Sequence, residues 1–175
     1  MFKTIITAIF LAINLALQVI GLPKPVTGII VNAIYIFLYH SCGLRHVFML
    51  AAFTPLLSFF TGHLPPPLIP IAPFIAIGNI LMALCYHIIK DRKAAVRAAV
   101  PAIIKALAIA VPGVFIAEKT GLNNAALLAV HVVISIQFFT AVPGILLGEY
   151  LFLRLAPALN RYKGPEKSIL PENTL

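Results

Sequence analysis

The feature that most constrains this chain is a series of long, uniformly apolar stretches with almost no charge inside them. Of its 175 residues, 61% are hydrophobic and only 10% are charged, and the mean hydropathy is +1.03. Globular domains in water carry about 25% charged residues. The strands of a membrane barrel would alternate apolar and polar residues, and these stretches do not. Because backbone polar groups in lipid must be satisfied within each segment, we predict an all-α integral membrane protein.

Turns and charged clusters divide these stretches into six predicted transmembrane helices. The first is followed by a turn at residues 21–25, and the fourth stops at the charged residues 90–93. Pro143-Gly144 lies inside the sixth stretch, where we expect the helix to bend or break. We divide the chain into a membrane domain of residues 1–159 and a polar tail, residues 160–175, that we expect to be disordered. The predicted helices cover residues 4–20, 26–42, 46–60, 68–89, 98–117 and 124–154.

The distribution of lysine and arginine predicts the orientation of the bundle. With the N-terminus inside, ten of the 13 basic residues lie on the inner side, two lie outside, and Lys105 lies within the membrane. An excess of positive charge marks the cytoplasmic loops of membrane proteins, so we expect both termini in the cytoplasm. This bias also accounts for the net charge of +8 without a nucleic-acid partner. No small-residue cleavage site follows the first stretch, which we therefore expect to remain as a helix.

Polar side chains are concentrated in the predicted outer half of the bundle. Such residues are costly in a membrane and tend to face the bundle interior or a cavity. Each one taken alone is more often a hydrogen bond between helices than a ligand contact. Because four segments contribute to the same half, we predict a ligand pocket there. Its candidate residues are Asn14 and Gln18, Asn32 and Tyr35, Asn79, and His131 and Ser135.

Two further pocket candidates depend on where their side chains point. Lys105 lies near a helix centre, where insertion costs about 2.5 to 3.5 kcal/mol. It therefore either extends to the inner interface or meets an anionic ligand group. His63 begins the Pro-rich stretch that continues into Leu64-Pro-Pro-Pro, which we interpret as a stiff lid above Asn79. His63 is otherwise an ordinary loop histidine, and the sequence does not decide whether His63 or His131 contacts a metal-bearing ligand such as haem.

The first predicted helix has two different faces. Ala8, Ala12 and Ala16 repeat every four residues and form a smooth stripe, about 200° round the helix from Asn14 and Gln18. Small residues at this spacing allow a second helix to approach closely in lipid. The stripe either packs inside the bundle or binds a partner. A partner is favoured if the polar face looks into the pocket.

Signatures of catalysis are missing from the sequence. Asp91 is the only aspartate, and it lies in a basic loop, while the four glutamates are not paired within any segment. No Ser-His-Asp set, phosphate-binding loop or zinc-binding spacing is present. We therefore expect neither enzymatic activity nor a cofactor.

Taken together, these features resemble the substrate-binding S components of energy-coupling-factor (ECF) transporters. The resemblance covers nearly the whole chain, through its size, its six segments and the Ala8-x-x-x-Ala12 stripe. Two local motifs add to it: Gly21-Leu-Pro-Lys-Pro-Val-Thr-Gly28 with Asn32, and Leu64-Pro-Pro-Pro with Pro73-Phe-Ile-Ala-Ile-Gly-Asn79. The resemblance implies capture of a vitamin-like micronutrient at the outer face of a prokaryotic cell membrane. It also implies three partner subunits, namely a transmembrane coupling subunit docked on the alanine stripe and two cytoplasmic ATPases.

The chain departs from well-known S components in its pocket. It has no tryptophan and no intramembrane acid cluster of the kind that thiamine-binding members use. We therefore expect a neutral or anionic, partly apolar solute instead of a cation. Two alternative functions belong to other classes of membrane protein. A stand-alone secondary transporter or channel would need no ATPases, although no inverted repeat is visible. A membrane enzyme or assembly factor would lose turnover on mutation of Glu149 or His131.

Overall fold

The computed structural model describes residues 2–62, 64, 66–119 and 124–163, and every regular element in these ranges is helical. The all-α prediction is thereby confirmed. The predicted ends at Ile20, Cys42, Phe60 and Ile89 coincide with the observed ones, because charges, glycines and prolines follow each of them. The elements are α1 (Phe2–Ile20), α2 (Lys24–Cys42), α3 (Leu44–Phe60), the 3₁₀ helix η1 (Pro66–Ile71), α4 (Ala72–Ile89), α5 (Ala94–Lys119) and α6 (Asn124–Lys163).

Five of the helical stretches are long and apolar enough to cross a membrane. They are Lys3–Ile20, Lys24–Cys42, Leu68–Ile89, Ala94–Ile116 and Ser135–Ala158. The remaining helix, α3, is apolar but shorter, with 17 residues and a length of about 25 Å at 1.5 Å per residue. The chain thus has the composition and helix lengths of a multi-pass membrane protein.

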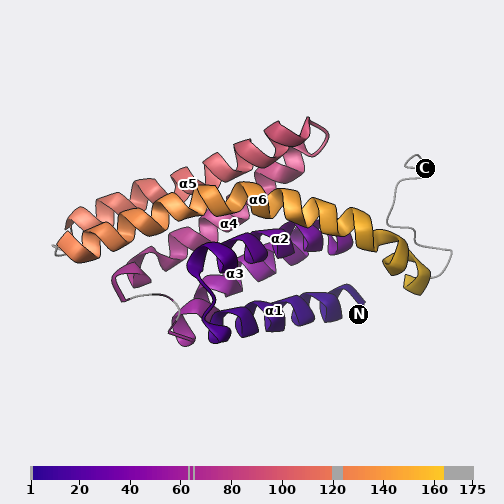
Figure 1. The fold of residues 1–175 in the computed structure, drawn as a ribbon, viewed down its shortest axis with the longest axis horizontal. Helices are drawn as coiled ribbons and strands as arrows, with labels where there is room; N and C mark the ends of the chain where they lie inside the picture. Colours follow the sequence, from indigo (N-terminus) through magenta and orange to yellow (C-terminus); the bar gives the residue numbers. More distant parts are fainter. Residues whose placement is uncertain (1, 63, 65, 120–123, 164–175) are drawn as a thin grey trace.

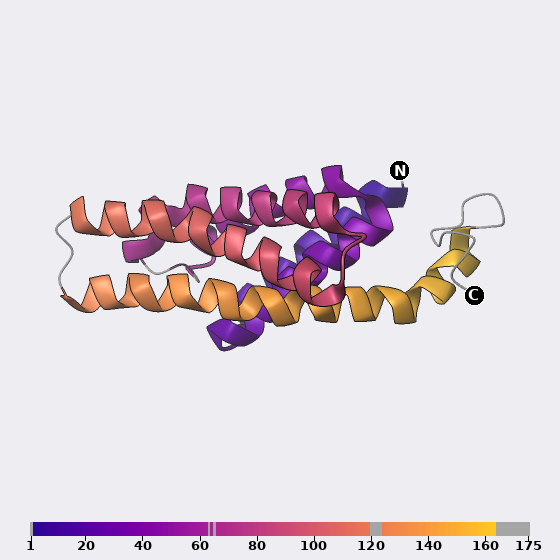
Figure 2. The ribbon, with the colours of Figure 1, turned by 90° about the horizontal axis from the view of Figure 1, so that it is seen from above.

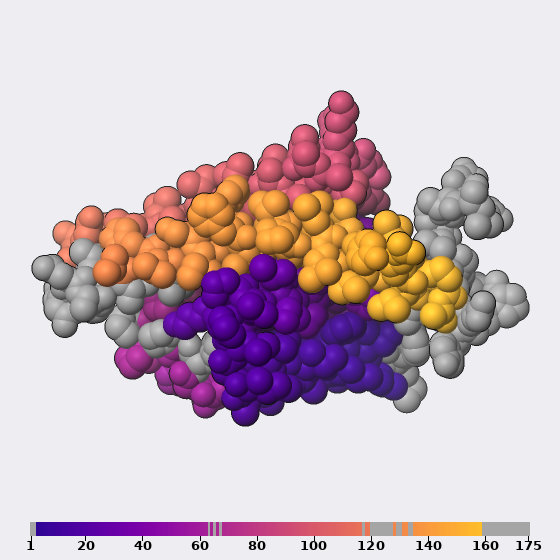
Figure 3. All heavy atoms as spheres, in the orientation of Figure 1, coloured from indigo at the N-terminus to yellow at the C-terminus, as the bar shows by residue number. Residues whose placement is uncertain are grey.

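The helices form an elongated bundle in which α6 runs along the whole length (Figures 1 and 2). α2 packs chiefly on α6, and α4 and α5 pack on each other, while α1 contacts only α2 and α3 extensively. Figure 3 shows the face on which α1, α2 and α6 lie side by side. The start of α1 and the end of α6 lie toward the same end of the bundle (Figure 1), here called the basic end. η1 lies toward the opposite end, here called the η1 end.

Glycines allow α2 and α6 to approach each other at the backbone. A Cβ atom added to Gly144 would lie 2.8 Å from the carbonyl oxygen of Ile29, and one added to Gly148 would lie 2.5 Å from that of Ala33. At Gly28 an added Cβ would lie 2.9 Å from the Thr140 hydroxyl. These three glycines form a seam that no larger residue fits, and Gly144-x-x-x-Gly148 has the spacing of close-packed membrane helices.

We expected Pro143-Gly144 to bend or break the sixth helix, and the structure excludes a break. α6 continues as one helix of 40 residues through both Pro143 and Pro157. Proline removes one helical hydrogen bond, but packing against neighbouring helices keeps such a segment helical. Gly144 serves close packing with α2 instead of a turn. α6 also includes residues 160–163 of the predicted tail, while residues 164–175 lie outside the described part of the chain.

Candidate functional site

A polar cavity of about 130 Å³ lies inside the bundle at the η1 end. All six α-helices and η1 contribute to its wall, so the cavity is a property of the whole fold. Three of the predicted pocket residues, Gln18, Asn79 and Lys105, line it together. Lys24, Thr27, Gly28, Val31, Thr54, Ser58, Leu64, Leu68, Ile75, Ile136, Gln137 and Thr140 complete the wall.

Lys105 is the charged group deepest in this wall. Its side chain is buried, with 3% of its surface exposed, and its Nζ atom donates a hydrogen bond of 2.7 Å to Oδ1 of Asn32. The amine is thus held in the bundle interior and does not extend to the basic end. Lys24 is a second basic residue of the wall, and no aspartate or glutamate is among the described lining residues. A protonated lysine has three donors, so Lys105 has donors left for a ligand.

Two amide oxygens in the cavity wall have no hydrogen-bond partner among the described residues. Asn79 donates from Nδ2 to the hydroxyl oxygen of Tyr35, at 3.3 Å, and its Oδ1 atom is left without a donor. Oε1 of Gln18 likewise has no hydrogen-bond donor among the described residues. Leaving a buried polar atom unpaired costs about 1 to 3 kcal/mol. A molecule that brings N–H or O–H donors into the cavity would recover this energy.

η1 and Leu64, two residues before it, cover one side of the cavity. Leu64 and Leu68 line the cavity, and Leu68 and Ile71 pack with Ile109 of α5 in a small hydrophobic cluster. Pro66 begins η1 and Pro70 lies inside it, so proline restricts the backbone on both sides of Leu68. The Pro-rich stretch is therefore a packed wall of the cavity as well as a loop. His63 lies outside the described residues.

The remaining predicted pocket residues do not line the cavity. Asn32 and Tyr35 lie behind it and contact it through Lys105 and Asn79. Asn14 is fully buried, and neither atom of its amide has a partner among the described residues. His131 and Ser135 are exposed on the first part of α6, where the Ser135 hydroxyl donates to the carbonyl oxygen of His131 at 3.0 Å. These two candidates of the sixth segment therefore do not line the cavity.

The two faces of α1 are oriented oppositely in the bundle. Asn14 and Gln18 are buried, whereas Ala8, Ala12 and Ala16 are exposed. The alanine stripe is thus an outer surface of this chain and not an internal packing face.

Sequence reasoning missed several polar residues of the wall. Thr27, Thr54, Ser58, Gln137 and Thr140 were not among the candidates, although Thr54 and Ser58 lie four residues apart and share a helix face. Hydroxyl side chains in apolar helices commonly bond to their own backbone, as Thr54 does to the carbonyl oxygen of Leu50 at 2.7 Å. Gln137 was the one detectable signal, as an amide within the sixth apolar stretch.

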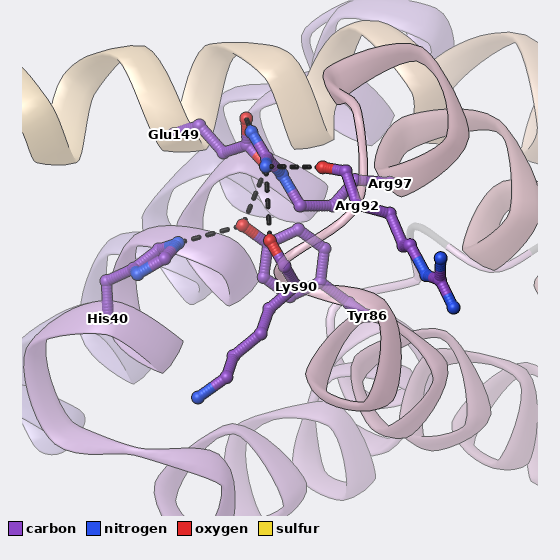
Figure 4. A network of polar contacts seen from close by, with 6 residues as sticks. All are labelled: His40, Tyr86, Lys90, Arg92, Arg97 and Glu149. Carbon is purple, nitrogen blue, oxygen red and sulfur yellow. Dashed lines mark hydrogen bonds and ion pairs between the residues drawn. The ribbon is translucent and has the colours of Figure 1, made fainter.

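A second polar cluster lies toward the basic end, and the sequence prediction missed it. Arg97 of α5 forms two bonds to Glu149 of α6, from Nε to Oε1 at 2.5 Å and from Nη2 to Oε2 at 2.7 Å. The Tyr86 hydroxyl donates to Oε1 of the same carboxylate at 2.7 Å and lies 2.8 Å from Nε2 of His40. Figure 4 shows this arrangement, here called the Arg97–Glu149 cluster.

The Arg97–Glu149 cluster joins four helices and one loop. His40 belongs to α2, Tyr86 to α4, Arg97 to α5 and Glu149 to α6. Nη1 of Arg97 also donates to the carbonyl oxygens of Lys90 and Arg92, at 3.1 and 3.0 Å, which ties the α4–α5 loop to the same point. A bidentate arginine–carboxylate pair of this kind is strong and directional.

Comparison with known proteins adds no relative to this description. No protein-family model, no curated protein and no solved structure matches the chain. Within the described residues, no group of three histidine, cysteine, aspartate or glutamate side chains could hold a metal ion. The candidate function therefore depends on the cavity and the surfaces of this chain alone.

Proposed function

We propose that this protein is a membrane-embedded subunit that captures a small solute, in the manner of the S component of an ECF transporter. The observation that carries the proposal is the polar cavity beneath η1. It contains a buried lysine without an acidic partner in the described wall, and two amide oxygens without donors. In a membrane, buried polar groups of this kind are retained at substantial cost and mark sites of function.

The chemistry of the cavity favours a small solute with a carboxylate. Lys105 and Lys24 supply positive charge, and the amide oxygens of Gln18 and Asn79 accept from N–H or O–H groups of the solute. Leu64, Leu68 and Ile75 supply apolar contacts. An engineered apolar cavity of about 150 Å³ admits benzene, so a cavity of about 130 Å³ suits a molecule the size of one ring.

The remaining parts of the proposal rest on charge, on the surface and on the resemblance to S components, which implies a prokaryotic cell membrane and two ATPases. The excess of basic residues favours both termini in the cytoplasm, with the cavity toward the outside. The exposed alanine stripe of α1 offers a docking surface for a transmembrane coupling subunit. Two cytoplasmic ATPases would drive the cycle, and this chain itself would not be an enzyme.

Native mass spectrometry of the protein extracted in mild detergent tests this function. We expect the wild type to carry an additional small mass, and Lys105→Met to lose it. Lys119→Met is the matched control, because Lys119 is exposed on α5 over the Phe115 ring and does not line the cavity. Retention of the same mass by Lys105→Met would contradict the proposed site.

The Arg97–Glu149 cluster favours one alternative, a stand-alone secondary transporter. Both residues lie inside candidate membrane spans, where ionisable pairs often mark ion pathways. Such a transporter would move solute into liposomes that contain this chain alone, driven by an ion gradient. The capture subunit would bind solute in the same liposomes without accumulating it, so the uptake measurement separates the two functions.

A further inference from the structure

A groove of about 350 Å³ lies between α1 and α3, separate from the polar cavity. The two helices run in the same direction, and both begin at the basic end. Their facing residues recur at helical spacing, so the groove follows the helix axes for about 10 Å at 1.5 Å per residue. Its lining residues are Thr4, Thr7, Ala8 and Leu11 of α1 and Arg45, His46, Met49, Leu50 and Phe53 of α3.

Polarity changes along this groove. The end near the start of both helices is lined by the hydroxyls of Thr4 and Thr7 and by the side chains of Arg45 and His46. The rest is apolar, with Leu11, Met49 and Phe53 as its largest side chains. Met49 and Phe53 are about half exposed, at 46% and 48%. The groove therefore combines a polar, basic end with a long apolar channel open to the outer surface of the bundle.

The charge at the polar end is not balanced by the protein. Arg45 is exposed, and no carboxylate of the described residues forms an ion pair with it. No acidic residue lines the groove. The Thr7 hydroxyl donates to the carbonyl oxygen of Lys3 at 2.8 Å, which leaves its oxygen able to accept. An anionic headgroup that carries hydroxyl groups matches this end of the groove better than a zwitterionic headgroup does. The ammonium group of a zwitterion would find no partner here.

We propose that the α1–α3 groove binds an anionic phospholipid. The phosphate accepts from Arg45 and from the Thr4 hydroxyl, a hydroxyl group of the headgroup donates to the Thr7 oxygen, and one acyl chain lies along Leu11, Met49 and Phe53. Basic pockets between membrane helices are suited to such headgroups, and each nearby basic side chain contributes about 1 kcal/mol to the attraction. The site is separate from the solute cavity and shares only Ala8 with the alanine stripe proposed as a docking surface, so it does not require the proposed function to hold.

The test uses the full-length protein reconstituted in vesicles that contain equal amounts of phosphatidylglycerol and phosphatidylcholine. After gentle extraction, the lipids that remain bound are counted by native mass spectrometry. We expect phosphatidylglycerol to be retained in preference to phosphatidylcholine. Arg45→Gln should reduce that preference by about fivefold, the factor that corresponds to about 1 kcal/mol.

Arg92→Gln is the matched control, because Arg92 is an exposed basic residue of the α4–α5 loop and does not line the groove. It should keep the preference for phosphatidylglycerol. A second variant, Phe53→Ala, shortens the apolar channel and should lower retention of both lipids. Equal retention of the two lipids by the wild type, or an unchanged preference in Arg45→Gln, would overturn the proposal. A protein helix found in the groove in place of lipid would overturn it as well.

Discussion

Lys105 and Asn32 form a buried pair whose members depend on each other. Asn32 is 1% exposed, and its side-chain oxygen accepts the hydrogen bond of Lys105. Asn32→Leu would keep the volume of the side chain but leave the ammonium group without this acceptor. We expect a loss of about 1 to 3 kcal/mol in the free energy of unfolding, the cost of an unpaired buried polar group.

The double variant Asn32→Leu/Lys105→Met should recover most of that loss, because it removes both partners of the bond. The measurement is reversible unfolding in detergent micelles for the wild type, both single variants and the double variant. Additive effects would show that the two side chains do not interact.

Several hydrogen bonds near the basic end converge on the carboxylate of Glu149. Two nitrogens of Arg97 and the Tyr86 hydroxyl donate to its carboxylate, which is 12% exposed. Glu149→Gln would leave the guanidinium group half-buried without its counter-charge, and we expect it to destabilise the bundle by about 2 to 3 kcal/mol. Lys90→Gln is the control, since Arg97 contacts Lys90 only at its backbone oxygen. A Glu149→Gln protein as stable as this control would show that the cluster does not hold the helices together.

Single residues differ in how far the sequence reveals them. Gln18, Asn79 and Lys105 could be predicted, because a polar group in an apolar helix needs a polar surrounding. The pairing of Arg97 with Glu149 was missed, because partners were sought only within one segment. An acidic residue in an apolar stretch requires a partner somewhere, and that requirement alone would have directed attention to another helix.

At the scale of elements, the glycine seam between α2 and α6 sets a strict limit on side-chain size. A Cβ atom at position 148 would lie 2.5 Å from the Ala33 carbonyl oxygen and 2.8 Å from Cβ of Ile36. Gly148→Val should separate the helices and lower the free energy of unfolding by about 1 to 3 kcal/mol. Ala158→Val, at an exposed site of the same helix, should have little effect. Equal stability of the two variants would contradict the close approach.

Two adjacent aliphatic residues of η1 differ in exposure, which allows a matched comparison of their substitutions. Leu68 is buried and lines the cavity, whereas Ile69 is 40% exposed. Leu68→Ala should speed release of bound solute, about tenfold if the lost contact is worth about 1.4 kcal/mol. Ile69→Ala should leave the release rate unchanged. The rate is measured by dilution of the loaded protein into an excess of unlabelled solute, and equal rates would remove η1 from the retention mechanism.

The helices themselves could be predicted from the sequence more fully than their packing. Long apolar stretches specify where α1, α2 and α4 lie, because the cost of exposed backbone in lipid leaves little alternative. The continuity of α6 could not be predicted from Pro143, since it depends on α2 packing against Gly144 and Gly148. The short 3₁₀ helix before α4 depends likewise on the contact of Leu68 and Ile71 with Ile109.

At the scale of the whole molecule, the proposed complex depends on the outer face of α1. Ala12→Trp would place a large ring on the exposed alanine stripe without entering the bundle. We expect solute uptake by the assembled transporter to be abolished while solute binding to this chain is unchanged. Ile13→Trp is the matched control, because Ile13 is 41% exposed but lies about 100° round the helix from Ala12. Normal uptake with Ala12→Trp would refute docking on the stripe.

The length of α6 has a consequence for what surrounds the molecule. Its 40 residues extend for about 60 Å, twice the thickness of about 30 Å of the hydrocarbon layer. The candidate span Ser135–Ala158 covers only part of α6, and the helix extends past it in both directions. His131 is exposed on the part of α6 that precedes this span. A histidine-modifying reagent that cannot permeate cells would react with His131 only if this end of α6 faces the outside, so its adduct would identify the side of the membrane on which the first part of α6 lies.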